Sequence, residues 1–153
     1  MSNDIHQGPI VIASDHAGYK LKAFVEEKLT EMGIAFEDVG AHDYDPADDY
    51  TLFTVRAAKA VSEGTFSRGI ALCGSGIGTS MIANRFRGVR AALCITPEMA
   101  RLSRQHNNSN ILVMGERITT LEVAEEILKE WLKTPFEGGR HEKRIQAIDS
   151  AVC

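Results

Sequence analysis

Short, nearly unbroken apolar runs alternate along the chain with longer segments in which apolar residues recur every three or four positions. An unbroken apolar run is typical of a strand buried on both faces of a parallel sheet, and the wider spacing is typical of an amphipathic helix. The expected strands cover residues 9–13, 34–39, 70–72, 89–95 and 111–114. The expected helices cover residues 21–32, 50–62, 81–86, 96–106, 121–131 and 140–144.

The repeated alternation of strand and helix predicts an α/β fold, a three-layer α/β/α sandwich on a five-stranded parallel sheet with right-handed crossovers. We expect one domain over residues 1–153, with the strand order 2-1-3-4-5 and a C-terminal helical arm over about 136–153. In that order the topological switch lies between the first and third strands, and ligands bind at the carboxyl ends of those strands. Asp15, His16 and Cys73 stand at these ends.

Composition and charge narrow the classes of function. The 153 residues are 44% hydrophobic and 25% charged with a net charge of -4, so broad nucleic-acid binding is not expected. No apolar run approaches membrane-spanning length, and the first residues lack a signal-peptide pattern. Cys73, Cys94 and Cys153 form no CxxC pair, which favours a reducing cytoplasm over a disulfide framework or a zinc site.

The stretch 69–79 combines a thiol with a glycine-rich turn. Cys73 stands where the third strand is expected to end, and alternating glycines lead from it into a helix. Free backbone N–H groups and the helix dipole point at such a corner, so it can bind an anion and favour the thiolate form of Cys73. The alternative reading of a lone cysteine is a small buried hydrophobe. The residues of this corner are Gly74, Ser75, Gly76, Ile77 and Gly78.

Three known phosphate-binding motifs do not fit this corner. A dinucleotide fingerprint needs glycine where Thr79 stands, and a thiol phosphatase needs arginine at the same position. A P-loop needs a lysine, and this stretch contains none. What remains is a thiol beside a loop that can stabilise an oxyanion.

Two histidines and a carboxylate are candidates for acid–base chemistry. Asp15 and His16 follow the first strand, although an aspartate there can also act only as the N-cap of the next helix. His106 lies in the polar run 103–110, where the alternative is a solvated helix end. These side chains could hold or move protons near the thiol.

Arginines near the C-terminus are candidates for phosphate binding. Arg140 and Arg144 are four residues apart and so share one helix face, and Arg117 lies just past the fifth strand. Such arginines can clamp a phosphate or form a solvated basic helix end. With the thiol, the loop and the histidines, they suit proton abstraction next to a carbonyl on a phosphorylated substrate. Some acyl or phosphoryl transfers on cysteine would suit the same residues.

Four motifs, in the right order over nearly the whole chain, are similar to those of type B ribose-5-phosphate isomerases. They are Ser14–Gly18, Cys73–Gly78, Ser103–Asn107 and Glu137–His141. The family also holds galactose-6-phosphate and allose-6-phosphate isomerases. The resemblance implies an aldose–ketose isomerisation of ribose 5-phosphate and ribulose 5-phosphate through a cis-enediolate, without a metal or another cofactor.

Carried over by position, the resemblance makes Cys73 the base that moves a proton between the first two carbons of the sugar. Ser75 and the backbone amides of residues 74–78 support the thiolate and hold the enediolate oxygen. His106 opens the furanose ring, and Asp15 lies on the opposite side of the sugar. The further residues that it assigns to substrate binding are His16, Tyr50, Gly74, Gly76, Ile77, Gly78, Asn107, Arg117, Arg140 and Arg144.

The resemblance also implies how the substrate is held and how chains assemble. His16, Arg117, Arg140 and Arg144 hold the phosphate, and Asn107 binds sugar hydroxyls. The family forms its site between two subunits, so we expect a homodimer with shared active sites, or a tetramer. Nucleic acids and membranes are not expected partners.

One departure from the family pattern concerns the start of the second expected helix. Thr51 follows Tyr50 where the family usually has proline. We expect a looser helix entry there, which would change the sugar-facing wall, so allose 6-phosphate, galactose 6-phosphate and a tetrose phosphate are alternative substrates. The rival class is a non-catalytic signalling module on a flavodoxin-like sheet. Such a receiver would carry an aspartate where Cys73 stands.

Overall fold

The chain alternates strands and helices over residues 8–151, which are the residues that this computed structural model describes. The strands are β1 (Ile10–Ser14), β2 (Phe36–Asp38), β3 (Arg68–Cys73), β4 (Ala91–Leu93) and β5 (Ile111–Gly115). The helices are α1 (Tyr19–Glu31), α2 (Tyr50–Ser62), α3 (Ile77–Ala83), α4 (Pro97–Asn107), α5 (Leu121–Lys133) and α6 (Arg140–Ser150), and a 3-10 turn, η1 (His16–Gly18), precedes α1. None of these described helices is long and apolar enough to cross a membrane. The two ends of the predicted domain, with Cys153, lie outside the described residues.

Side-chain caps explain where two of the later helices begin. The Thr96 hydroxyl accepts the backbone N–H of Met99 at 3.1 Å, and Pro97 takes the first helical position of α4. The Thr120 hydroxyl accepts the backbone N–H of Val123 at 3.3 Å at the start of α5. These are local signals, and they begin both helices close to their predicted positions.

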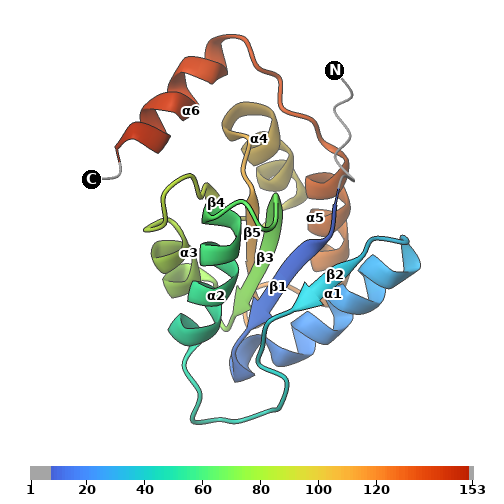
Figure 1. Cartoon of the computed structure of the whole chain (residues 1–153). Helices are drawn as coiled ribbons and strands as arrows, with labels where there is room; N and C mark the ends of the chain where they lie inside the picture. The colour runs from blue at the N-terminus through green and yellow to red at the C-terminus, as the bar shows by residue number, and fades with distance from the viewer. Residues whose placement is uncertain (1–7, 152–153) are drawn as a thin grey trace.

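The strands form one parallel sheet between two layers of helices (Figure 1). One hydrophobic core joins the sheet to α1, α4 and α5, and a second core joins its other face to α2 and α3. Alternate residues of β1 show the division, because Ile10 and Ile12 belong to the first core and Val11 and Ala13 to the second. The predicted α/β sandwich with a five-stranded parallel sheet is confirmed.

The predicted strand order 2-1-3-4-5 is wrong in its last two positions, because the sheet has the order β2-β1-β3-β5-β4. All five residues of β5 are buried, and β5 pairs with β3, Cys73 standing opposite Gly115. The three residues of β4 are only partly buried, which suits the edge of the sheet. In the order of the sheet, the step from β4 to β5 goes the same way across the sheet as the step from β1 to β2. A right-handed crossover therefore puts α4 on the same face as α1.

The outer side of β4 is covered by a side chain. The Asn84 amide oxygen accepts the backbone N–H of Ala91 at 2.8 Å, and its amide nitrogen donates to the Ala91 carbonyl at 2.9 Å. Asn84 lies just past the C-terminal end of α3. One amide therefore satisfies both backbone groups that Ala91 directs away from the sheet.

The C-terminal segment crosses the end of α4 and forms α6, at the opposite end of the molecule from the loop over 40–49 (Figure 1). Ile145 and His141 are the buried residues of α6. An ion pair between Arg90 and Asp149, with a nitrogen–oxygen distance of 2.9 Å, links α6 to the segment before β4. α6 thus packs on α4 on the amino-end side of the sheet, and the carboxyl ends lie on the far side.

Candidate active site

A cleft of about 350 Å³ opens at the carboxyl ends of β1, β3 and β5. It lies at the predicted switch point, since β1 and β3 are neighbours in the sheet. The structure brings most of the predicted chemical residues together there, and Gly76 and Ile77 continue the same loop. The cleft is lined by Asp15, His16, Ala17, Tyr50, Cys73, Gly74, Ser75, Gly78, Arg117 and Ile118.

Cys73 ends β3 at the base of this cleft, with 5% of its surface exposed. Its Sγ accepts the backbone N–H of Gly76 at 3.0 Å. Gly76 has a φ of 80°, in the left-handed region that favours glycine, and this turn aims its N–H back at the sulfur. A backbone N–H in this position stabilises negative charge on the sulfur, as a base made from a thiol requires.

Tyr50 packs directly against the glycine-rich corner. A Cβ atom at Gly78 would overlap the Tyr50 hydroxyl group, so glycine lets the ring approach the start of α3. The Ser75 hydroxyl oxygen accepts the backbone N–H of Ile77 at 3.2 Å. Its own hydrogen can then be donated to another acceptor in the cleft.

The loop after β5 is fastened to the cysteine corner by the backbone. The N–H of Glu116 donates to the Cys73 carbonyl and the N–H of Arg117 donates to the Gly74 carbonyl, each at 2.9 Å. The Glu116 carboxylate accepts the backbone N–H of Leu21 at 2.8 Å, which joins the same loop to α1. Arg117 is therefore held at the rim of the cleft, with its guanidinium close to Gly74.

Asp15 both caps a turn and lines the cleft. Its carboxylate accepts the backbone N–H of Gly18 at 3.1 Å, so the N-cap reading of this residue holds. Burial raises the pKa of the Asp15 carboxyl above its usual value, and the nearby Asp48 charge adds to this shift. Both roles fit one side chain, because the second carboxylate oxygen is not needed for the cap.

Asp48 belongs to the site and was missed by the sequence analysis. It accepts a hydrogen bond from the backbone N–H of His16 at 3.0 Å and lies 2.6 Å from Nδ1 of the same residue. Several aspartates share the loop over 40–49, so no spacing distinguished this one from its neighbours. Its contact with His16 fixes the imidazole at the cleft wall.

The start of α2 is capped by a side chain and is not the looser helix entry that we expected. The Asp49 carboxylate accepts the backbone N–H of Thr51 at 3.0 Å and the hydroxyl of Thr51 at 2.9 Å. These bonds lower the pKa of the Asp49 carboxyl. Asp49 therefore caps the helix through an N–H that proline would lack, and Tyr50 begins α2 without the proline.

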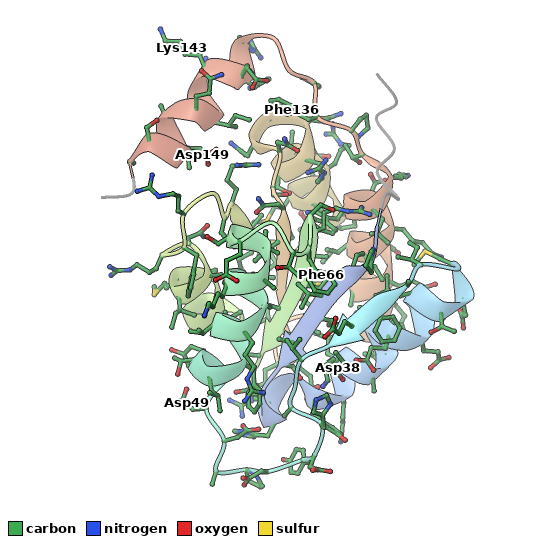
Figure 2. All side chains as sticks on the ribbon, viewed as in Figure 1. Asp38, Asp49, Phe66, Phe136, Lys143 and Asp149 are labelled. Atoms are coloured by element: carbon green, nitrogen blue, oxygen red, sulfur yellow. The ribbon has the colours of Figure 1, made fainter. Side chains whose placement is uncertain are left out.

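The other predicted residues lie at the far end of the sheet. α4 starts after the carboxyl end of β4 and therefore finishes, with His106 and Asn107, near the amino ends of the strands. The backbone confirms this placement, because Asn110 accepts the N–H of Gly69 at 2.8 Å at the start of β3. Figure 2 labels Asp49, at the start of α2, and Phe136, near α4, at opposite ends of the molecule.

Arg140 and Arg144 also lie away from the cleft, exposed on α6. One chain thus holds two partial sets of chemical residues. The cleft set surrounds Cys73, and the far set gathers around His106. Within one chain, the two sets therefore lie too far apart to contact the same substrate molecule.

A family model described as Ribose/Galactose Isomerase matches residues 10–148. The chain belongs to this family. The resemblance that the four motifs carry is therefore confirmed, and the chain is similar over most of its length to proteins named as isomerases.

Relatives of this ribose/galactose isomerase family member include ribose-5-phosphate isomerase B of Escherichia coli, strain K12. The two are 41% identical over 139 residues, which cover 91% of this chain and 93% of that one. A crystal structure of the Thermotoga maritima ribose 5-phosphate isomerase is 46% identical, with a TM-score of 0.91, and covers 95% of this chain and 100% of its own. The Mycoplasma genitalium enzyme, crystallised with bound ribulose-5-phosphate, is 39% identical with a TM-score of 0.89, covering 93% and 94%.

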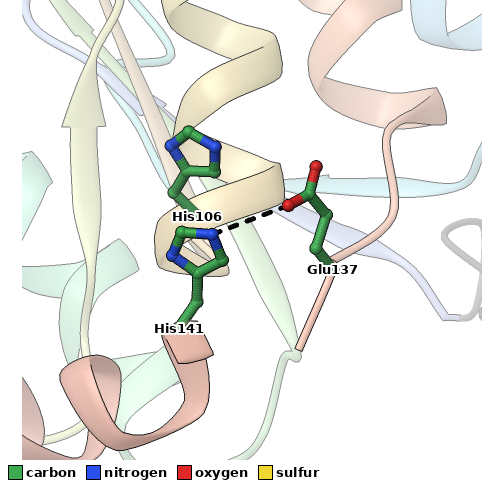
Figure 3. Close-up of side chains that lie close together, drawn as sticks. All are labelled: His106, Glu137 and His141. Carbon is green, nitrogen blue, oxygen red and sulfur yellow. Dashed lines mark ion pairs between the residues drawn. The ribbon is translucent and has the colours of Figure 1, made fainter. Parts of the chain in front are cut away.

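Two groups of side chains in the described part of this family member contain atoms that could ligate a metal ion. In the cleft, His16 and Asp48 are 2.6 Å apart and bonded to each other, and Asp15 is engaged as a cap. At the far end lie His106, Glu137 and His141 (Figure 3). The rings of these two histidines are nearly parallel, at 15°, so their planes do not meet at a common ion position nearby. In each group the possible ligand atoms lie within 4.8 Å of one another.

Proposed function

We propose that this chain is an enzyme that interconverts ribose 5-phosphate and ribulose 5-phosphate. The observation that carries the proposal is Cys73 at the base of the cleft, with an N–H directed at its sulfur and polar groups around it. A related structure with bound ribulose-5-phosphate supports the choice of substrate. The family match does not favour a signalling module, and the relatives named for ribose 5-phosphate do not favour a different sugar phosphate.

In the proposed reaction, the Cys73 thiolate removes the proton from C2 of the open-chain aldehyde. The C1 carbonyl oxygen takes the negative charge and a cis-enediolate forms. The carbon-bound proton is then returned at C1 while the C2 hydroxyl proton passes to the oxygen on C1, which leaves a ketone at C2. The Ser75 hydroxyl and the backbone N–H groups of the corner are suited to stabilise the enediolate oxygens.

We propose that the phosphate group lies at the rim of the cleft. His16 and Arg117 stand there, and both can donate hydrogen bonds to phosphate oxygens. Arg140 and Arg144 of the same chain cannot join them, because α6 lies at the other end of the molecule. A second chain would have to supply these arginines.

We therefore propose a homodimer whose active sites combine the cleft of one chain with His106, Asn107, Arg140 and Arg144 of the other. The carboxyl-end side of the sheet supports this arrangement, since large apolar side chains are exposed after the carboxyl ends of three strands. They are Ile77, Met81, Ile95, Met99 and Ile118, each between 40% and 66% exposed, and Ile118 also lines the cleft. A second chain that covers these side chains would bring its own far end close to Cys73.

The direct test is an isomerase assay with ribose 5-phosphate, with allose 6-phosphate, galactose 6-phosphate and erythrose 4-phosphate as parallel substrates. We expect ribose 5-phosphate to give the highest kcat/KM and a Cys73→Ala chain to be slower by about 10²–10⁴-fold. Higher kcat/KM for another sugar would contradict the proposed substrate. Full activity of Cys73→Ala would contradict the proposed base. A free thiol base also suits the reducing cytoplasm in which we propose the enzyme works.

A further inference from the structure

His141 is a buried residue on an otherwise mostly exposed helix. Its side chain is 5% exposed, whereas Arg140 and Arg144 on the same helix are exposed. The His141 ring stacks on the ring of His106, with 4.4 Å between the ring centroids and 15° between the planes (Figure 3). The arm therefore docks on α4 through His106, the histidine to which the family resemblance gives ring opening.

The stack is held from the backbone as well. The N–H of Glu137 donates to the carbonyl of Gln105 at 3.1 Å, one residue before His106. The Arg104 guanidinium donates to the carbonyl of Thr134 at 3.2 Å. These bonds fix the segment over 134–141 against the last turn of α4. The two imidazoles consequently face each other from two elements that cannot move far apart.

The charges around His141 favour its neutral form. Burial lowers the pKa of the His141 imidazole, and the nearby His106, Arg140 and Arg144 lower it further. The Glu137 carboxylate, 3.6 Å from Nε2 of His141, acts in the opposite direction but does not reverse the shift. A neutral ring beside His106 lets His106 accept a proton without a second positive charge 4.4 Å away.

We propose that His141 is a positioning residue for ring opening, whose stacked ring holds the His106 imidazole in the orientation needed for proton transfer at the sugar. This inference rests on the proposed role of His106. Ring opening breaks the bond between C1 and the ring oxygen. His106 takes the proton of the C1 hydroxyl and delivers a proton to the ring oxygen, so the net change is one proton moved between two oxygens. An imidazole that rotated freely would often direct its nitrogens elsewhere.

The test compares three variants of His141 in the full-length enzyme. His141→Ala removes the stacking ring, His141→Phe keeps an aromatic ring, and His141→Leu fills the space without one. For ribose 5-phosphate we expect a kcat about tenfold lower in His141→Ala and His141→Leu, with little change in KM. His141→Phe should recover most of the lost kcat. Lys143→Ala is the matched control, since Figure 2 shows this side chain pointing away from the rest of the molecule.

A second measurement separates positioning from general damage. Solvent deuterium exchange into ribulose 5-phosphate, which has no furanose ring to open, should stay normal in all three His141 variants because it depends on Cys73. Unchanged kcat in His141→Ala, no recovery in His141→Phe, or an equal loss of deuterium exchange would each overturn the inference. The variant His106→Asn distinguishes a failure of the proposed role of His106 from a failure of the proposed role of His141. Normal turnover of ribose 5-phosphate in His106→Asn would refute the proposed role of His106, whereas slow turnover there with normal His141→Ala would refute only the role of His141.

Discussion

Asp48 holds His16 at two points, accepting its backbone N–H at 3.0 Å and lying 2.6 Å from its ring Nδ1. An ionised carboxylate can only accept, so Nδ1 carries the proton of that bond. The other ring nitrogen, Nε2, is then the one available to a ligand in the cleft. The orientation of His16, which we predict binds the phosphate, thus depends on an aspartate 32 positions away in the sequence.

We predict that Asp48→Asn raises the KM for ribose 5-phosphate by roughly tenfold and changes kcat much less. The loss of one charge-assisted hydrogen bond costs about 1.5 kcal/mol, and that bond orients a group that binds substrate. Steady-state kinetics measure both constants. Asp45→Asn is the control, because Asp45 accepts the N–H of Ala47 in its own turn, which asparagine also does. Equal KM values for Asp48→Asn and Asp45→Asn would contradict the prediction.

The two described cysteines should differ sharply in reactivity. Cys73 lines the cleft, whereas Cys94 is 1% exposed and burial raises the pKa of its thiol to about 11. At pH 8 the Cys94 thiol therefore stays protonated and unreactive. We predict that iodoacetamide labels Cys73 first and that activity falls in proportion, with ribulose 5-phosphate protecting.

Peptide mass spectrometry after partial labelling checks this order. Cys94→Ala should lose activity to iodoacetamide at the same rate as the unaltered chain. Cys73→Ala should be slower than the unaltered enzyme by about 10²–10⁴-fold before any labelling, as for the loss of a general base. An enzyme fully labelled at Cys73 that still turns over would show that the thiol is not the base.

Two inactive chains should restore activity when mixed, if sites are shared between chains. One chain carries Cys73→Ala and the other carries Arg140→Ala with Arg144→Ala. In a heterodimer one site collects both defects and the other site has neither, so we predict up to half of normal activity per heterodimer. Subunit exchange is verified by native mass spectrometry. Exchange without recovered activity would show that each chain completes its own site.

Glu26 should make the stability of the fold depend on pH. Burial and the neighbouring Asp38 raise the pKa of its carboxyl from 4.5 to about 7, although Lys22 opposes the shift. The folded chain therefore keeps a proton that the unfolded chain releases once the pH exceeds about 4.5. The free energy of unfolding falls as the pH rises from 4.5 towards 7 and is level above that range.

We predict that Glu26→Gln, which is neutral at every pH, removes this fall and stabilises the protein at pH 8 by on the order of 1 kcal/mol. Urea unfolding at pH 5 and at pH 8 measures the effect. Glu27→Gln is the control, because Glu27 is exposed on the same helix. A pH dependence in Glu26→Gln that matches the unaltered chain would exclude this carboxyl as its source.

Local patterns predicted the helices and strands well, whereas the pairing of strands that are distant in the sequence was predicted less well. The helix predicted over residues 50–62 is α2 at Tyr50–Ser62, because its apolar spacing can be recognised within one short segment. The strand predicted over 89–95 is only three residues long and lies at the edge. No local pattern says which of two apolar runs pairs with β3, so the order of the last two strands could not be predicted from spacing.

The same distinction applies to the site. Cys73 and Asp15 could be predicted because each ends a strand, and the carboxyl ends of neighbouring parallel strands meet. Asp48 could not, because its importance comes from a loop that folds back to His16. His141 appeared in a motif, but its burial depends on where a short arm docks. The separation of His106 from Cys73 follows from topology, because a helix that starts after the carboxyl end of a strand finishes near the amino ends of the sheet.

The amide of Asn84, bonded to both backbone groups of Ala91, also bears on how these chains meet one another. The outer strand of an open sheet can pair with a strand of a neighbouring molecule and so seed aggregation. At β4 the outward backbone groups of Ala91 are already bonded to a side chain of the same molecule. Association through this edge is thereby discouraged, which leaves the chain's other surfaces to decide which contacts between molecules form.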